Sequence, residues 1–345
     1  MRLHLSQLAL VVGMGSLVAC SGDDSEPTAP AGAGGTASGT ATGGSGGFDA
    51  GGGGAGGVGG AGGEHSGPRL VVYCGNDPDA VLQFEAWLGR NVDAILGYTG
   101  AASWADYDGS VGWAVGLWSQ IDRPVYWSVP LIPEGATLEE AAQGSYNHHY
   151  LAAAQTLAAF RPQDEKLQIR TAWELNGDWF PWAAQDDAAS FVGAFREFVT
   201  TFRSASERFV FEWNANVGRN LSGEMDPADA YPGDGYVDII GMDFYWNTQW
   251  DPTDPQEAWS SMRDRTYGLT WHQDFAASHG KPTSYSEWGI MTDAAGPYIE
   301  HAASWFESHP VVFHTYWNSN SAFAGMLSDG QYPAAGAAYR AAFGP

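Results

Sequence analysis

Cysteine is scarce in this 345-residue chain, which contains 2, Cys20 and Cys74. The N-terminal pattern described below assigns Cys20 to processing, so Cys74 is left without an intrachain partner. A disulfide framework is therefore excluded, even in a compartment that would permit one. Cys74 follows the apolar run Leu70–Tyr73, and we expect it to be a buried thiol at the end of a strand.

Basic residues are scarce as well. The chain has 15 Lys and Arg against 40 Asp and Glu, which gives a formal charge of −25. A nucleic-acid-binding protein needs a basic footprint, and no Lys/Arg cluster supplies one here. The charge argues against nucleic acid as a partner, and also against anionic polysaccharides.

The sequence also lacks an apolar run long enough to cross a bilayer near its N-terminus. Leu5–Val18 is too short for that, and Arg2 precedes it. The run continues into L-V-A-C, which ends at Cys20 and resembles a bacterial lipobox. We predict that residues 1–20 are a lipoprotein signal peptide, with a lipid on Cys20 as the only membrane attachment at the outer membrane or cell surface. The alternative is an ordinary secretory signal with an incidental cysteine.

Residues 21–67 are rich in Gly, Ala, Ser and Thr. Such a composition cannot bury enough surface to offset its ordering entropy, so we predict a disordered linker. All 16 tryptophans lie after it. Residues 68–345 have the length of a single domain of the α/β barrel type.

Eight short apolar runs recur in that domain, each followed by a helical or loop segment. Most are nearly continuous, as expected for strands that are buried on both faces. This alternation predicts a (β/α)8 TIM barrel, with a doubly wound open sheet as the alternative. The runs are Leu70–Tyr73, Ala94–Tyr98, Val125–Val129, Leu167–Trp173, Phe209–Asn214, Val237–Phe244, Thr283–Glu287 and Val311–Trp317.

Several helix signals lie between these runs. Asp77 precedes a helix expected over Ala80–Arg90. Thr137 and Glu140 form a capping box for a single helix reaching Phe160. Two further helices are expected, over Ala188–Phe202 and Pro333–Ala342.

Active sites of such barrels lie at the carboxyl ends of the strands. The fourth run leads into R-T-A-W-E-L-N-G-D-W-F-P-W over Arg170–Trp182, in which the carboxylate of Glu174 is surrounded by indoles. Aromatic rings stack on the C–H faces of sugars, and a carboxylic acid can protonate a glycosidic oxygen. The stretch therefore indicates a sugar site.

This stretch resembles the acid/base motif of glycoside hydrolase family 26, R-x-x-H-E-M-N-G-x-W-F-x-W. The resemblance implies that Glu174 is the acid/base and that Arg170, Trp173 and Trp179 bind substrate. One position departs from the motif, since Trp173 stands where the family has a His that touches the sugar beside the cleaved bond. The reaction type follows from the resemblance, whereas β-mannan as the substrate does not.

The seventh run ends in S-E-W-G, which is similar to the nucleophile strand of that family and implies that Glu287 is the nucleophile. The two glutamates fall on the fourth and seventh runs, as they do in that clan of barrels. The alternative is that each glutamate makes a buried ion pair, for instance with Arg170. Arg170 precedes Glu174 by four positions, so we expect both side chains on the same side of the strand.

Three further residues follow from the resemblance. Tyr245 lies in a segment similar to Y-P-G-D-x-Y-V-D-x-x-G-x-D-x-Y and matches the tyrosine that hydrogen-bonds the nucleophile. Asn216 ends W-N-A-N, similar to W-S-P-N, and either binds sugar hydroxyls or holds a loop. Trp317 matches the platform under the sugar next to the cleaved bond. Other candidates are Trp127, Trp246 and Trp250 to extend the cleft, Glu212 in an ion pair and Asp243 in a buried hydrogen-bonding role.

His148 and His149 are placed in mid-helix without a second cluster at ligand spacing, so we expect no metal site and no cofactor. The sequence thus predicts a surface-anchored, monomeric, retaining endo-β-glycanase that acts on a mannan-type or related polysaccharide. The alternative is a surface glycan-binding lipoprotein that kept the cleft and lost turnover.

Overall fold

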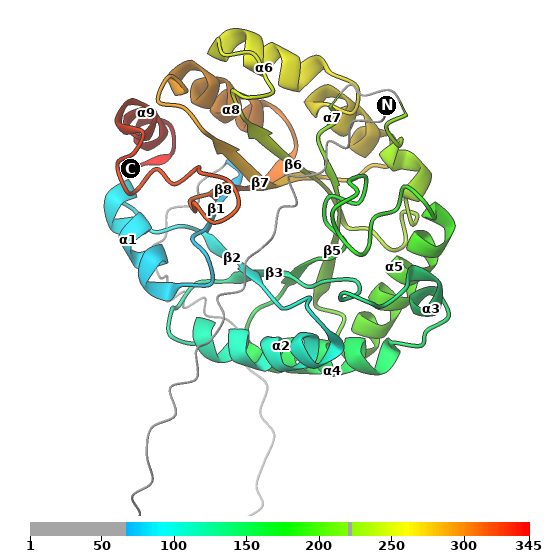
Figure 1. Cartoon of the computed structure of the whole chain (residues 1–345). Helices are drawn as coiled ribbons and strands as arrows, with labels where there is room; N and C mark the ends of the chain where they lie inside the picture. Colours follow the sequence, from blue (N-terminus) through cyan, green and yellow to red (C-terminus); the bar gives the residue numbers. More distant parts are fainter. Residues whose placement is uncertain (1–66, 220–222) are drawn as a thin grey trace, which may run out of the picture. The chain divides into compact units, whose positions relative to one another are not determined.

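The computed structural model of the chain describes residues 67–219 and 223–345. The described residues form a closed barrel of parallel strands (Figure 1), which confirms the predicted (β/α)8 class. Each strand pairs with the next, and β8 closes on β1 through pairs such as Arg69 with Phe313. The strands are β1 (Arg69–Tyr73), β2 (Ala94–Tyr98), β3 (Val125–Ser128), β4 (Leu167–Arg170), β5 (Phe209–Asn216), β6 (Ile239–Trp246), β7 (Thr283–Ile290) and β8 (Val311–Trp317).

The predicted signal peptide 1–20, its Cys20, and all but the last residue of the predicted linker 21–67 lie outside the described residues. Those assignments stay predictions. Where the structure is described, no helix has both the length and the apolar character that crossing a membrane requires.

Helices follow the strands and cover the outside of the barrel (Figure 1). The first begins at Pro78, before the expected Ala80, and Asp77 caps it as predicted by accepting from the backbone N–H of Asp79 and Ala80. It ends at Gly89, whose φ of 89° suits a residue without a Cβ. The helices are α1 (Pro78–Leu88), α2 (Trp104–Trp118), α3 (Leu138–Ala142), α4 (Asn147–Phe160), α5 (Ala188–Ala205), η1 (Pro227–Ala230), α6 (Pro255–Asp264), α7 (Leu269–Ser278), α8 (Gly296–Ser308) and α9 (Pro333–Phe343).

The single helix expected from Thr137 to Phe160 is wrong. Thr137 does cap a helix, accepting from the backbone N–H of Glu140, but that helix, α3, stops at Ala142. Gly144 then takes φ 77°, a left-handed conformation that breaks the helix before α4 begins.

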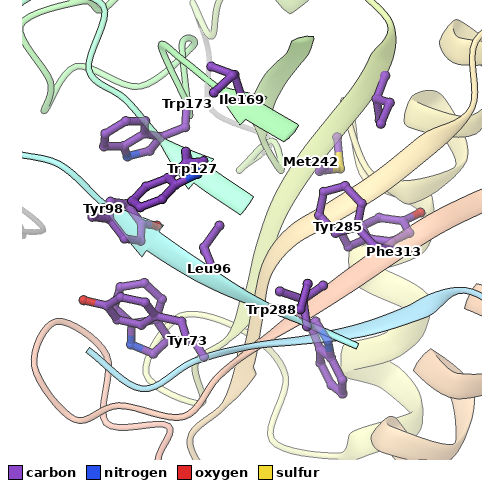
Figure 2. Packing of buried hydrophobic residues seen from close by; sticks show 14 of the residues in the cluster. Tyr73, Leu96, Tyr98, Trp127, Ile169, Trp173, Met242, Tyr285, Trp288 and Phe313 are labelled. Atoms are coloured by element: carbon purple, nitrogen blue, oxygen red, sulfur yellow. The ribbon is translucent and has the colours of Figure 1, made fainter. Parts of the chain in front are cut away.

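Large buried side chains pack inside the barrel and between its strands and the surrounding helices, and Figure 2 shows some of them. Tyr126 and Phe313 come from strands β3 and β8, which are not neighbours, yet their ring centroids lie 4.8 Å apart. They therefore meet across the interior of the barrel. Cys74 is a buried, free thiol just after β1, as expected.

Two tryptophans expected in the cleft lie in the core instead. Trp127 is buried against Phe160 of α4. Trp246 is buried against Tyr298 of α8, with a ring-centroid distance of 4.9 Å. Side chains alternate along a strand, so both indoles point outward into the helical layer. The third candidate, Trp250, is 72% exposed.

Candidate active site

The fourth strand ends earlier than its sequence suggests. β4 stops at Arg170, and the chain then passes through left-handed backbone at Ala172 (φ 52°) and Glu174 (φ 53°). Such conformations are unfavourable for residues other than glycine and occur where surrounding contacts enforce them, often at active sites. The turn also separates Arg170 from Glu174, so the expectation that both side chains share one side of a strand is wrong.

Glu174 is buried, with 4% of its surface exposed, and three groups fix it. The indole Nε1 of Trp179 donates to its Oε2 over 2.7 Å, and the amide of Asn216 donates to its Oε1. Its own backbone N–H donates to the side-chain oxygen of Asn214 over 3.0 Å. Burial, with the charge of Glu287 as second cause, raises the pKa of Glu174 to about 7 against the effect of the two hydrogen bonds.

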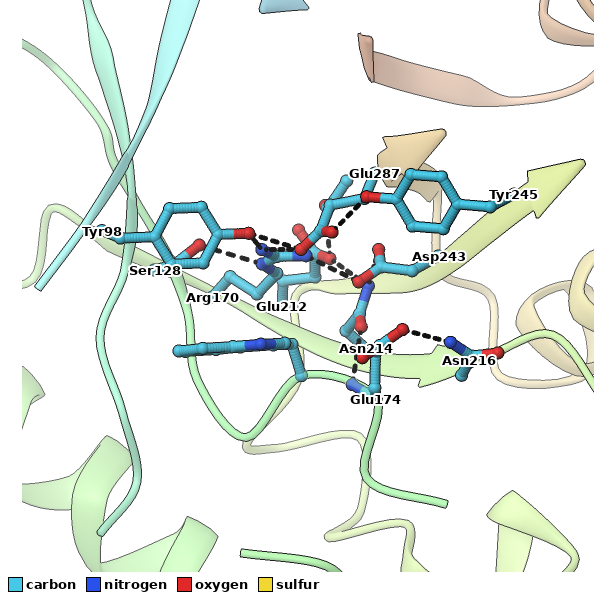
Figure 3. A network of polar contacts seen from close by, with 12 residues as sticks. Tyr98, Ser128, Arg170, Glu174, Glu212, Asn214, Asn216, Asp243, Tyr245 and Glu287 are labelled. Atoms are coloured by element: carbon cyan, nitrogen blue, oxygen red, sulfur yellow. Dashed lines mark hydrogen bonds and ion pairs between the residues drawn. The ribbon is translucent and has the colours of Figure 1, made fainter. Parts of the chain in front are cut away.

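Glu287 on β7 has a different set of neighbours (Figure 3). Arg170 donates through Nη2 to Glu287 Oε1 over 2.6 Å, and the hydroxyl of Tyr98 donates to the same oxygen. The hydroxyl of Tyr245 donates to Oε2 over 2.5 Å. A cation and two phenol donors stabilise the ionised carboxylate.

A continuous set of contacts links the two glutamates (Figure 3). Arg170 also donates through Nη1 to Asp243 Oδ2 over 2.8 Å. The Asn214 amide donates to the other oxygen of Asp243 over 2.9 Å, and its carbonyl oxygen accepts from the backbone of Glu174. The positions of Glu174 and Glu287 are therefore set by one shared network, in which Asp243 has the buried hydrogen-bonding role expected for it.

Glu212 lies on β5 and is fully buried. Its hydrogen-bond donors are the hydroxyl of Ser286 at 2.5 Å and the amide of Asn214 at 3.1 Å, so the expected ion pair is replaced by neutral donors. Burial raises the pKa of Glu212. Gly241 provides the space for this carboxyl group, since a Cβ there would lie 2.0 Å from Glu212 Oε1.

Aromatic side chains enclose the carboxylates. Trp317 is 1% exposed, and Tyr73 stacks on it with ring centroids 4.0 Å apart. Trp173 packs edge-on against Tyr98, with ring centroids 5.4 Å apart. The Arg170 guanidinium lies 5.3 Å from the centre of the Trp173 ring. The indole at position 173 thus lines the site beside the ion pair and leaves an apolar surface where the family has a histidine.

The structure brings the predicted residues together with several that the sequence did not single out. Tyr245 lies against the proposed nucleophile, as expected, and Asn216 contacts Glu174. Arg170, predicted to bind substrate, is buried and donates four hydrogen bonds to protein groups: Glu287, Tyr98, Asp243 and the hydroxyl of Ser128. Three residues of the network were not identified as site residues: Tyr98, Ser128 and Asn214. Each lies in the last three positions of a strand, and this position at the carboxyl end of a barrel strand could have identified them as candidates.

No group of three or more His, Cys, Asp or Glu within residues 67–219 and 223–345 is arranged to hold a metal ion. His148 and His149 lie in the first turn of α4, not in mid-helix. His149 contacts Asp108 on α2 over 2.8 Å and stacks on Trp104 at 4.1 Å. This histidine therefore holds α4 against α2.

Comparison with known proteins shows a partial match to one family of glycosyl hydrolases. The family model described as glycosyl hydrolase family 26 matches residues 139–261, which include Glu174 and Tyr245. Endoglucanase H of Acetivibrio thermocellus is 25% identical over 210 residues, covering 55% of this chain and 22% of that protein. The chain is therefore similar to glycosyl hydrolase family 26 over residues 139–261, which is less than half of its length.

The other similarities of this chain are shorter or lower in identity. Mannan endo-1,4-beta-mannosidase of Bifidobacterium adolescentis is 28% identical over 155 residues, covering 44% of this chain and 15% of that protein. The matches thus span less than a quarter of either curated relative. A family 26 beta-mannanase from Bacteroides ovatus shares the fold, with a TM-score of 0.53 and 14% identity over 80% of this chain and 90% of that one. A Bacillus subtilis mannanase gives a TM-score of 0.53 and 13% identity over 76% and 83%.

Proposed function

We propose that this protein is a family 26 glycoside hydrolase, a retaining endo-β-glycanase in which Glu174 is the acid/base and Glu287 the nucleophile. The observation that carries the proposal is the opposite environment of the two carboxyl groups. Burial raises the pKa of Glu174 to about 7, so this group can keep a proton to donate. Arg170 and two tyrosine hydroxyls instead stabilise a negative charge on Glu287. Such a pair separates the role of acid from that of nucleophile.

The proposed reaction has two steps. Glu287 attacks the anomeric carbon while Glu174 gives its proton to the glycosidic oxygen, so the C–O bond breaks and a glycosyl-enzyme ester forms. Glu174, now ionised, then takes a proton from water, and the resulting hydroxide equivalent displaces Glu287 from the sugar. A carboxyl separation of about 5–5.5 Å is expected for this course, which retains the anomeric configuration.

The proposed substrate is a neutral β-linked polysaccharide. The names of the two curated relatives refer to glucan and to mannan hydrolysis, and the indole of Trp173 separates this chain from the usual family pattern. Trp173 can donate one hydrogen bond and accept none, and its N–H is the only polar group it offers to a sugar. Mannan, glucomannan, mixed-linkage glucan and xylan are therefore the substrates to compare.

The test is release of reducing ends from this panel, with Glu174→Gln as the blank and NMR of the first product to read its anomeric configuration. The proposal expects cleavage of at least one polysaccharide with retention. An inverted product would overturn the nucleophilic role of Glu287. A wild-type protein that binds a glycan and cleaves none would be a surface glycan-binding protein.

We also propose that the enzyme is exported and anchored through lipid on Cys20. The support is the basic residue, short apolar run and lipobox-like L-V-A-C at residues 1–20. The composition of residues 21–67 would then give the barrel freedom to move beside the membrane.

A further inference from the structure

We propose a second glycan-binding site on the outside of the barrel, at the start of α7. The inference rests on the proposed function, since it assigns the same polysaccharide to a second surface. The structure has a depression of about 450 Å³ there, where α6 gives way to α7. Its aromatic and polar lining includes Tyr267, Trp271, Phe275, Thr270, Asp264 and Asp274.

The aromatic part of the depression is a corner made by two rings. Tyr267 and Trp271 are both partly exposed, and their rings stand at 81° with centroids 5.4 Å apart. Phe275 stacks on Trp271 at 5.1 Å and nearly in parallel, which holds the indole in place. Partly exposed rings held in fixed positions offer the apolar C–H faces of a sugar a surface for contact.

The polar part of the depression suits hydroxyl groups. Asp274 is exposed on the same helix as Trp271, one turn before Ser278 ends it, and the hydroxyl of Thr270 lies one turn earlier. Carboxylate oxygens accept hydrogen bonds from sugar hydroxyls, and their charge disfavours phosphate or uronate groups. The ligand that fits both parts is therefore a neutral polysaccharide.

The base of the corner is held firmly by Arg265. Its guanidinium donates to Asp251 over 2.6 Å and to the carbonyl of Gly218 over 3.3 Å, so it joins the loops after β6 and β5. Gly218 in turn donates its N–H to the carbonyl of Tyr267 over 3.0 Å. A Cβ at Gly218 would lie 2.0 Å from the carbonyl oxygen of Thr266, so this close approach requires glycine.

The corner is connected to the active site by a short series of contacts. Gly218 follows β5, whose last residue, Asn216, contacts Glu174. The next residue, Arg219, places its guanidinium 5.0 Å from the ring centre of Trp179, the indole that donates to Glu174. Both sites therefore lie at the same end of the barrel. A polysaccharide held at α7 would be kept at high local concentration beside the catalytic carboxylates.

The test compares Trp271→Ala and Asp274→Ala with Trp113→Ala. Trp113 is a matched control, because it is 51% exposed on α2. With the polysaccharide that the wild type cleaves best, we expect the KM of the first two variants to rise several-fold. Their turnover of an aryl β-disaccharide should stay unchanged, because that substrate is too short to reach α7. Trp113→Ala should behave as the wild type.

Wild-type KM values in both Trp271→Ala and Asp274→Ala would overturn the proposal. A reading that does not depend on turnover is affinity electrophoresis in gels with glucomannan or mixed-linkage β-glucan. In these gels the polysaccharide should slow the migration of Trp113→Ala but not that of Trp271→Ala or Asp274→Ala. Equal slowing of all three variants would also overturn the site. If the wild type cleaves nothing, the proposed function fails, and this electrophoresis still decides the α7 site by itself.

Discussion

Arg170 and Glu287, 117 positions apart in the sequence, form a buried ion pair with Nη2 and Oε1 separated by 2.6 Å. Both side chains are 2% exposed. Arg170 binds Asp243 as well, so one guanidinium is shared by two buried carboxyl groups. The ion pair does not compete with a catalytic role for Glu287, because a nucleophile has to stay ionised in a site that excludes water.

The first prediction concerns stability. Arg170→Met leaves Glu287 and Asp243 buried without their cation, which should lower the free energy of unfolding by about 3–5 kcal/mol. Arg263 is the matched control, since its pair with Asp264 is largely exposed and Arg263→Ala should cost no more than about 1 kcal/mol. Urea unfolding followed by tryptophan fluorescence measures both. Equal, small effects would mean that Arg170 is not the counter-ion described here.

The second prediction concerns pH. Burial and the charge of Glu287 raise the pKa of Glu174 to about 7, above that of an unfolded glutamate, so the folded state binds its proton more tightly. This contribution to stability is complete below the unfolded pKa and is lost as the pH rises through about 7. The rate of polysaccharide cleavage should fall over the same upper range. Glu174→Gln should show a flatter dependence of stability on pH.

A related variant sharpens that assignment. The indole of Trp179 donates to Glu174, which favours the ionised form. Trp179→Phe removes this donor, so the alkaline limb of the pH–rate profile should move to higher pH. Trp250→Phe, at an exposed position, should leave the limb where it is. A shift in the opposite direction would show that another group titrates in that limb.

The third prediction concerns Tyr98, whose hydroxyl donates to Glu287. Tyr98→Phe should lower kcat for an aryl glycoside by about 10- to 100-fold, as expected when a charged group loses one hydrogen bond. Tyr245→Phe should have a similar effect. Tyr126→Phe is the control, because that hydroxyl accepts from Arg69, away from the carboxylates. Unchanged turnover in Tyr98→Phe would remove this residue from the site.

The fourth prediction concerns the anchor. Cys20→Ser removes the thiol that would carry the lipid, so the protein should move from the membrane fraction to the soluble fraction with its activity intact. Fractionation and mass spectrometry of the mature N-terminus measure this. A wild type found wholly soluble, without residues 1–20 and without lipid on Cys20, would contradict the lipoprotein assignment.

The sequence was sufficient to predict the barrel because parallel strands buried on both faces appear as short, nearly continuous apolar runs. It could not show where β4 ends. The left-handed backbone at Ala172 and Glu174 follows the strand, so the position of Glu174 is not set by the alternation of side chains that places Arg170. The break between α3 and α4 has the same origin, since a glycine within a helical pattern does not reveal its own φ.

The sequence also could not show which side chains at the strand ends point into the barrel and which point outward. Ser128 faces Arg170, so its neighbour Trp127 has to point away from the site. In the same way, Tyr245 faces Glu287 and its neighbour Trp246 points outward to Tyr298 of α8. Tyr98 ends its strand on the inner side, and the alternation along the second run would have identified it once the barrel axis was known.

The central claim is the division of labour between Glu174 and Glu287, and one measurement tests it most directly. Glu174→Ala and Glu287→Ala are compared on the cleaved polysaccharide and on an activated aryl glycoside, with and without azide. Glu174→Ala should no longer cleave the polysaccharide, whose leaving group needs a proton. It should still form the glycosyl-enzyme from the aryl glycoside, and azide should accelerate the breakdown of that intermediate. Glu287→Ala should fail on both substrates because no covalent intermediate can form. Near-normal turnover by Glu287→Ala would contradict the account.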